Sequence, residues 1–151
     1  MNFWLMKTEP QVFSIFDLKD KGTDSWEGVR NYQVRNFMRD VMKPGDKAII
    51  YHSGKKPEAV GTAVITSCGY PDHTAWDTGN RYYDPASKPE KPIWFMVDVR
   101  FESMFDKQVD LKTMREIKEL EDLVILKKGN RLSITQLTET EFDTIVRLSQ
   151  K

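Results

Sequence analysis

Two apolar runs joined by a short loop constrain the fold of this chain more than any other feature. Residues 47–52 and 59–67 are rich in Ile and Val, and the loop between them holds Gly54 and Pro57. Such runs predict two neighbouring strands. A strong third strand is predicted over residues 93–101, with no helix pattern directly before it. Because strands and helices do not alternate strictly and no glycine-rich phosphate loop is present, a doubly wound α/β fold is disfavoured.

Helix signals lie at the start, in the middle and at the end of the sequence. Residues 14–17 and 138–141 read as capping boxes, the first opening a short helix that ends at Gly22. Apolar residues spaced three and four apart predict a helix over residues 34–41, stopped by the turn at 43–46. The other expected elements are a strand over 3–7, a helix over 111–120, and short strands over 124–126 and 132–135. We therefore expect an α+β fold, with a mixed sheet curled into a small barrel and helices outside it.

Length and charge set limits on the class of protein. The chain has 151 residues, which suits one domain with a real core. Lys+Arg and Asp+Glu both number 23, so any contact with phosphates must come from a local basic patch. The single Cys68 forms no internal disulfide, which fits a reducing cytoplasm or nucleus. No apolar run approaches the roughly 20 residues of a membrane span, so no membrane partner is expected.

The segment from Trp26 to Asn36 is the densest in chemistry. It combines an aromatic residue, a turn glycine, two arginines and two asparagines. An aromatic ring stacks on a base, an Asn amide pairs with a base edge, and arginine holds phosphate, so the segment indicates contact with nucleic acid. For Trp26 two interpretations stand equal: one wall of an aromatic pocket, or a plug in the mouth of the barrel.

Basic residues recur at helical spacing after this segment. Arg35, Arg39 and Lys43 lie four apart, so a helix would align them in one ridge next to Arg30. Such a ridge can span successive phosphates and make binding sensitive to salt. For a charge run alone, a solvated helix face is the favoured explanation. Between Arg30 and Lys43, however, only Asp40 opposes the cations, which favours phosphate contact.

The stretch from residue 69 to 92 predicts a long loop inside the domain. Loops of this length are usually functional or disordered, and its Trp76, Tyr82 and Tyr83 argue for order. The same aromatic residues are compatible with a surface that docks a protein partner, which is the leading alternative to nucleic-acid binding.

Catalysis and metal binding have weak support. Cys68, His52 and His73 are the only thiol and imidazole groups, and their spacing is poor for zinc. Cys68 is expected to pack as a small apolar residue at a strand end, and a lone histidine is more often structural. We therefore expect no catalytic residue, no metal and no cofactor, with a nucleotide-processing enzyme as a less favoured alternative.

The chain resembles the EVE domain, a member of the PUA-like superfamily related to YTH domains. The resemblance runs in order along nearly the whole chain, as a single domain over 1–151. It is carried by the motifs at residues 4–10, 26–31, 34–36, 45–46, 51–53, 70–72, 82–85, 87–89, 94–99 and 129–133. Thr8 stands where the family often has Ser, and Val34 where it often has Ala.

This resemblance implies a PUA-like pseudo-barrel flanked by helices. It also implies a reader of a modified base in DNA or RNA, with modified cytosine the leading proposal, which flips the base into an aromatic-lined pocket. A short bacterial, cytoplasmic form is expected; the sequence gives no signal for oligomeric state. The expected base-pocket residues are Trp26, Asn31, Tyr32, His52 and Ser53, and the expected contacts to the nucleic-acid backbone are Lys7, Arg30, Arg35 and Arg39.

Overall fold

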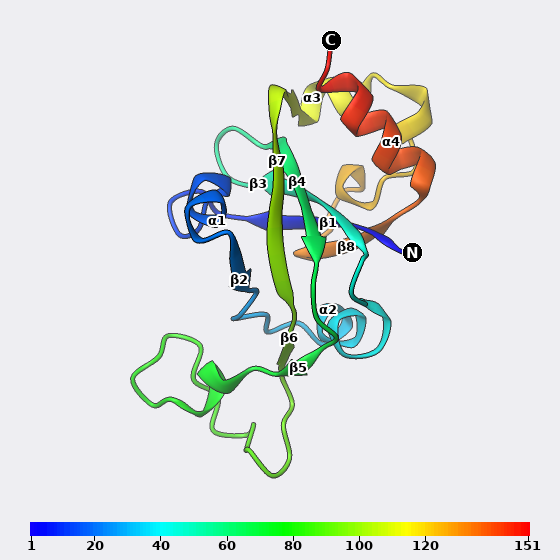
Figure 1. The fold of residues 1–151 in the computed structure, drawn as a ribbon. Coiled ribbons are helices and arrows are strands. Elements are labelled where there is room, and N and C mark those ends of the chain that lie inside the picture. The colour runs from blue at the N-terminus through cyan, green and yellow to red at the C-terminus, as the bar shows by residue number, and fades with distance from the viewer.

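One mixed sheet of six strands forms the centre of the computed structural model, which describes residues 1–151 (Figure 1). The strands of the protein are β1 (Phe3–Thr8), β2 (Thr23–Ser25), β3 (Lys47–His52), β4 (Glu58–Ile65), β5 (Tyr70–Pro71), β6 (Phe95–Met96), β7 (Asp98–Asp110) and β8 (Ile134–Leu137). The order in the main sheet is β2-β7-β4-β3-β1-β8. Only β1 and β3 run parallel, and β5 and β6 pair in a separate two-stranded sheet.

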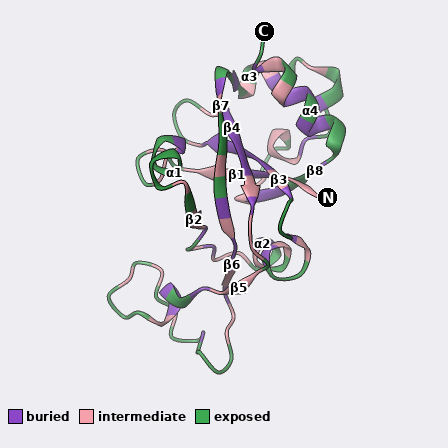
Figure 2. Ribbon diagram, viewed as in Figure 1, coloured by how far each residue is buried: buried purple, intermediate pink, exposed green.

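The central strands are buried on both faces. Side chains of successive strand residues point to opposite faces, so Trp4 and Met6 join one hydrophobic core while Leu5 joins another. In β3, Ile50 belongs to the first core and Ile49 to the second. Burial on both faces explains why these strands read as near-continuous apolar runs (Figure 2).

Helices cover the two faces of this sheet. The α-helices are α1 (Ile15–Lys21), α2 (Tyr32–Asn36), α3 (Leu111–Arg115) and α4 (Glu139–Leu148); a π-helix η1 (Phe37–Val41) continues α2, and short 3-10 turns are η2 (His73–Trp76), η3 (Lys118–Leu120) and η4 (Val124–Leu126). Residues of α1 and α2 pack in the first core, and those of α3 and α4 pack in the second. None of the helices is both long and apolar enough to cross a membrane.

Both predicted capping boxes are confirmed. The Ser14 hydroxyl accepts a hydrogen bond from the Asp17 amide and the Asp17 carboxylate accepts one from the Ser14 amide. Thr138 and Glu141 make the same reciprocal pair at the start of α4. These caps satisfy amides that have no partner within the helix, which explains why local sequence alone located both helices.

Three local predictions are wrong, and one predicted helix is confirmed with a different hydrogen-bond pattern in its second half. Residues 124–126 form a 3-10 turn and not a strand. The helix predicted over 34–41 widens into a π-helix, in which the Met42 amide donates to the Phe37 carbonyl. β7 continues to Asp110, well past the expected end at residue 101. The sequence does not predict the second half of this strand, because most of its residues are polar and exposed. Cys68 is exposed and does not pack as an apolar residue.

The expected architecture is nevertheless confirmed. The mixed sheet curls into a half-barrel with helices outside it, an α+β arrangement (Figure 1). The chain between β5 and β6 projects beyond one end of the sheet, and the segment that joins β2 to α2 lies beside it. The projecting loop and the segment beside it form part of the wall of a cavity that extends to the end of β1.

Candidate functional site

A cavity of about 530 Å³ lies where β1 ends. Its walls come from segments far apart in the sequence: the end of β1 and the turn before α1, the stretch from β2 to residue 30, and two residues of the 69–92 loop. The apolar lining residues are Val12, Phe13, Trp26, Val29 and Tyr82. The charged lining residues are Lys7, Glu9, Lys21, Asp24, Glu27, Arg30 and Arg81.

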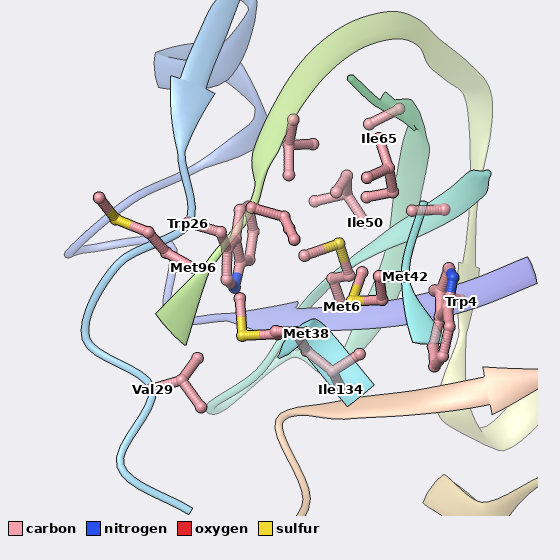
Figure 3. Packing of buried hydrophobic residues seen from close by; sticks show 14 of the residues in the cluster. Trp4, Met6, Trp26, Val29, Met38, Met42, Ile50, Ile65, Met96 and Ile134 are labelled. Carbon is pink, nitrogen blue, oxygen red and sulfur yellow. The ribbon is translucent and has the colours of Figure 1, made fainter. Parts of the chain in front are cut away.

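Trp26 is both a wall of this cavity and part of the core. Only 9% of its surface is exposed, and it packs in the first hydrophobic core near Met38 and Met96 (Figure 3). Its ring meets the Phe13 ring edge to face, with the centroids 5.9 Å apart. Trp26 therefore lies in the wall of the cavity and also fills space in the core, and it presents only a small part of its ring to a ligand.

Arg30 is held inside the protein by the loop opposite. Its Nη1 lies 3.1 Å from the Asp72 carboxylate, and its Nε and Nη2 donate to the Tyr82 carbonyl at 3.1 and 2.6 Å. Nη2 also donates to the Thr74 hydroxyl at 3.3 Å. With these partners the guanidinium is largely engaged, so Arg30 is not the free phosphate ligand that its charge suggested.

The Asp72 carboxylate is the centre of this network. Its side chain is fully buried, and it accepts hydrogen bonds from the amides of Gly28 and Thr74, each at 2.9 Å, and from the Thr74 hydroxyl. Burial alone raises the pKa of Asp72, but the bonds from Thr74, Gly28 and Arg30 outweigh it and hold the pKa below its ordinary value. Asp72 is therefore ionised at neutral pH and fastens the 69–92 loop to the segment before α2.

Gly28 lets Tyr82 approach the backbone. Its φ of 84° lies in the left-handed region, and a Cβ atom at this position would overlap the Tyr82 ring. Tyr82 and its neighbour Arg81 thereby close one side of the cavity. The order that the aromatic residues predicted for the loop is confirmed, while the contribution of Tyr82 and Arg81 to the site had no clear signal in the sequence.

Two cations at the cavity have no carboxylate partner. Lys7 is partly buried and forms no ion pair, and burial lowers its pKa. Arg81 is exposed, and its guanidinium lies 5.1 Å from the centre of the Tyr82 ring. Lys21, by contrast, is paired with Asp24 at 3.3 Å. Lys7 and Arg81 are thus the cations of the cavity best placed to meet an anionic ligand.

The four other expected base-pocket residues do not line this cavity. The Asn31 side chain accepts from the Val34 amide at 3.0 Å and caps α2. His52 is buried, and its Nε2 accepts from the Ile15 amide at 3.1 Å. Tyr32 is 60% exposed and stacks on Trp94, and Ser53 follows the end of β3, where its amide donates to the Thr8 carbonyl.

The predicted basic ridge does not form as one row. Arg35 donates to the Ile93 carbonyl at 2.7 Å and lies over the Tyr32 ring, while Arg39 pairs with the adjacent Asp40 at 2.8 Å. Lys43 falls beyond the end of the helix, because the π-helix stops at residue 41. None of these three residues lines the cavity.

Comparison with known proteins places this geometry in a family. The model of the EVE domain matches residues 2–148. Human thymocyte nuclear protein 1 is 41% identical over 98% of this chain and 74% of its own length. A structure of a hypothetical protein from Leishmania major matches with a TM-score of 0.94 and 38% identity, over 99% of this chain and 95% of the other. The structure of the human THYN1 protein in complex with DNA containing 5-methylcytosine matches with a TM-score of 0.93 and 40% identity, over 100% and 99%.

Proposed function

The chain belongs to the EVE domain family, and on this premise we propose that it binds DNA that carries a modified cytosine, without catalysing a reaction on it. The observation that carries the proposal is the likeness, over the whole chain, to a human protein whose structure was solved with DNA containing 5-methylcytosine. The cavity beside Trp26 is the site that we assign to the modified base. A cavity of about 530 Å³ lies within the range of roughly 300–1,000 Å³ that holds small ligands.

The base enters this cavity by leaving the helical stack. Extrusion costs a few kcal/mol, and stacking on aromatic rings returns roughly 1–3 kcal/mol per base. Phe13, Trp26 and Tyr82 supply aromatic surface to the cavity. Tyr82 is more exposed than Trp26, so it offers the larger ring area to a base.

The carboxylates of the cavity suit a base with an exocyclic amine, which cytosine, adenine and guanine carry and thymine lacks. The exocyclic amine of cytosine donates hydrogen bonds, and the carboxylates of Asp and Glu accept them. Glu9 and Glu27 both line the cavity, both are exposed, and neither forms an ion pair. We assign recognition of the amine to this pair, while the methyl group contributes only about 0.8 kcal/mol by burial.

The test is a binding titration with matched labelled oligonucleotides, read by fluorescence anisotropy at low and moderate salt. The set carries cytosine, 5-methylcytosine, 5-hydroxymethylcytosine and methylated adenine, each in DNA and in RNA. We expect the tightest binding to DNA with a modified cytosine. The Glu9→Gln/Glu27→Gln variant is expected to lose preference for cytosine-type bases. Each carboxylate only accepts hydrogen bonds, whereas the glutamine amide that replaces it can also donate them and so no longer selects for an amine on the base.

Variants of the aromatic wall complete the test. Tyr82→Ala is expected to weaken binding of the modified oligonucleotide by about tenfold, the value of one stacked ring. Trp26→Phe keeps an apolar ring in the core, whereas Trp26→Ala would confound binding with a loss of stability. Equal binding of every oligonucleotide at both salt concentrations would reject the proposal.

Protein docking and catalysis have less support than base reading. The 69–92 loop, the candidate docking surface, is fastened to the segment before α2 and lends Arg81 and Tyr82 to the cavity. The candidate nucleophile Cys68 is exposed and lines neither hollow of the surface, and the His52 Nε2 already accepts from the Ile15 amide.

A further inference from the structure

A second hollow, of about 380 Å³, lies between the β3–β4 loop and the start of α3. Its basic lining residues are Lys55 and Lys56 of the loop and Lys112 and Arg115 of α3. We call these four residues and the hollow they surround the basic hollow. All four side chains are exposed, and none of them forms an ion pair.

One carboxylate faces these cations, and it is already engaged. Asp110 accepts from the Thr113 amide at 2.7 Å, which caps α3. The bonds from Thr113, followed by the nearby charges of Lys112 and Lys56, hold the pKa of Asp110 below its ordinary value. The basic hollow therefore has an excess of positive charge in a chain whose net charge is zero.

One wall of the base cavity, at Thr8, lies at the same end of the sheet as the basic hollow. Strand pairing puts Thr8 opposite His52, His52 opposite Glu58, and Glu58 opposite Asp110. Thr8 lines the cavity and Asp110 lines the basic hollow, so one row across four neighbouring strands joins the two sites. Three spacings of about 4.8 Å between strands put Thr8 about 14 Å from Asp110 along the sheet. Ser25, on another wall of the cavity, pairs with Asp98 at the start of β7, which is about 40 Å from Asp110 along that strand.

We propose that the basic hollow binds the phosphodiester backbone of the nucleic acid whose modified base occupies the cavity. This inference rests on the proposed function. Distances of about 14 to 40 Å correspond to about 4 to 12 base-pair steps at 3.4 Å each, so a 20-base-pair duplex is long enough to reach both sites. The hollow reads no sequence: it holds phosphate and positions the duplex, while the cavity specifies the base.

The experiment compares the salt dependence of duplex binding in three proteins. The first is the wild type, the second Lys56→Ala/Lys112→Ala, and the third Lys127→Ala/Lys128→Ala, which removes two exposed lysines that line neither hollow. Each is titrated with 20-base-pair duplexes with and without 5-methylcytosine, between 50 and 200 mM salt. A trinucleotide that carries the modified base, too short to span both sites, is the second ligand.

We expect Lys56→Ala/Lys112→Ala to bind both duplexes about tenfold more weakly at low salt, with the slope of log affinity against log salt reduced by about one to two. In this variant, the preference for 5-methylcytosine and the affinity for the trinucleotide are expected to equal those of the wild type. The Lys127→Ala/Lys128→Ala variant is expected to equal the wild type in affinity, preference and salt slope.

Two results would overturn the inference. One is a slope and an affinity in Lys56→Ala/Lys112→Ala equal to those of the wild type. The other is an equal loss in the Lys127→Ala/Lys128→Ala variant, which would reflect charge in general. The outcome for base reading is separate. A wild type that binds duplexes with and without 5-methylcytosine equally rejects the proposed function, and the salt slopes of the three proteins still decide whether the basic hollow binds phosphate. A wild type that binds no duplex at 50 mM salt rejects both.

Discussion

Arg30 and Asp72, 42 residues apart in the sequence, meet in an ion pair of 3.1 Å that joins the segment before α2 to the 69–92 loop. The carboxylate is fully buried, and only 24% of the arginine side chain is exposed. Because the same loop brings Tyr82 to the cavity, this pair positions part of the binding site, and Arg30 itself lines the cavity.

Replacing Asp72 by Asn is expected to lower the free energy of unfolding by about 3 kcal/mol, since it leaves the partner charge of a buried pair uncompensated. Urea denaturation at pH 7 measures this. Asp40→Asn is the matched control, because Asp40 pairs with Arg39 at an exposed site and is expected to change stability much less than Asp72→Asn. Similar small losses in both variants would mean that Asp72 does not hold the loop.

Replacing Gly28 by Ala is expected to displace Tyr82 and to weaken oligonucleotide binding. The new Cβ would overlap the Tyr82 ring, and the backbone would also be strained at φ 84°. Gly22→Ala separates the two effects, because Gly22 has a φ of 79° but no atom within 4 Å of the added Cβ. We expect Gly22→Ala to cost about 1 kcal/mol by backbone strain alone and Gly28→Ala clearly more.

A double-mutant cycle identifies the overlapping partner. If Gly28→Ala displaces the Tyr82 ring, the free energy of unfolding of Gly28→Ala/Tyr82→Ala should fall by less than the sum of the losses in the two single variants. Denaturation of all four proteins gives the coupling energy. A sum that is simply additive would place the conflict elsewhere.

Elements specified by neighbouring residues were predictable from sequence, and elements specified by distant ones were not. The two capping boxes lie within four residues each, so the starts of α1 and α4 were correct. The second half of β7 was missed because its exposed polar residues look like a loop until β4 pairs with them.

The site shows the same division. Trp26, predicted as a base-pocket residue, and Lys7, predicted as a contact to the nucleic-acid backbone, both line the cavity. The sequence predicts Arg30 as a phosphate ligand because the partner, Asp72, lies 42 residues further on. Tyr82 and Arg81 were missed as site residues for the same reason, since only the folded loop brings them to Gly28.

His52 predicts a stability change near neutral pH. Its Nε2 accepts from the Ile15 amide, so protonation breaks a buried hydrogen bond, and burial lowers the pKa of His52 below the ordinary 6.5. The unfolded chain therefore binds the proton more readily than the folded one. Stability should be complete above pH 6.5 and fall as the pH drops below it, by at most about 1.4 kcal/mol per pH unit.

Urea denaturation between pH 5 and 8 measures this dependence. His52→Gln is expected to flatten the curve in that interval, whereas His73→Gln, which removes the only other histidine, an exposed one, should leave it unchanged. A curve that stays steep in His52→Gln would assign the pH dependence to another group.

Lys7 predicts opposite changes in binding and stability. Burial lowers its pKa, so its charge is disfavoured in the folded protein, and no carboxylate compensates it. Lys7→Met keeps the apolar stem and should leave the free energy of unfolding unchanged or higher, since a buried charge is removed. The same change should weaken oligonucleotide binding about tenfold, because one charged hydrogen bond contributes about 1.5 kcal/mol.

Lys21→Met is the control at the same cavity. Because Lys21 is already paired with Asp24, this change should affect binding less. Denaturation and titration of both variants measure the two effects, and a Lys7→Met protein that is less stable but binds normally would make Lys7 a structural residue.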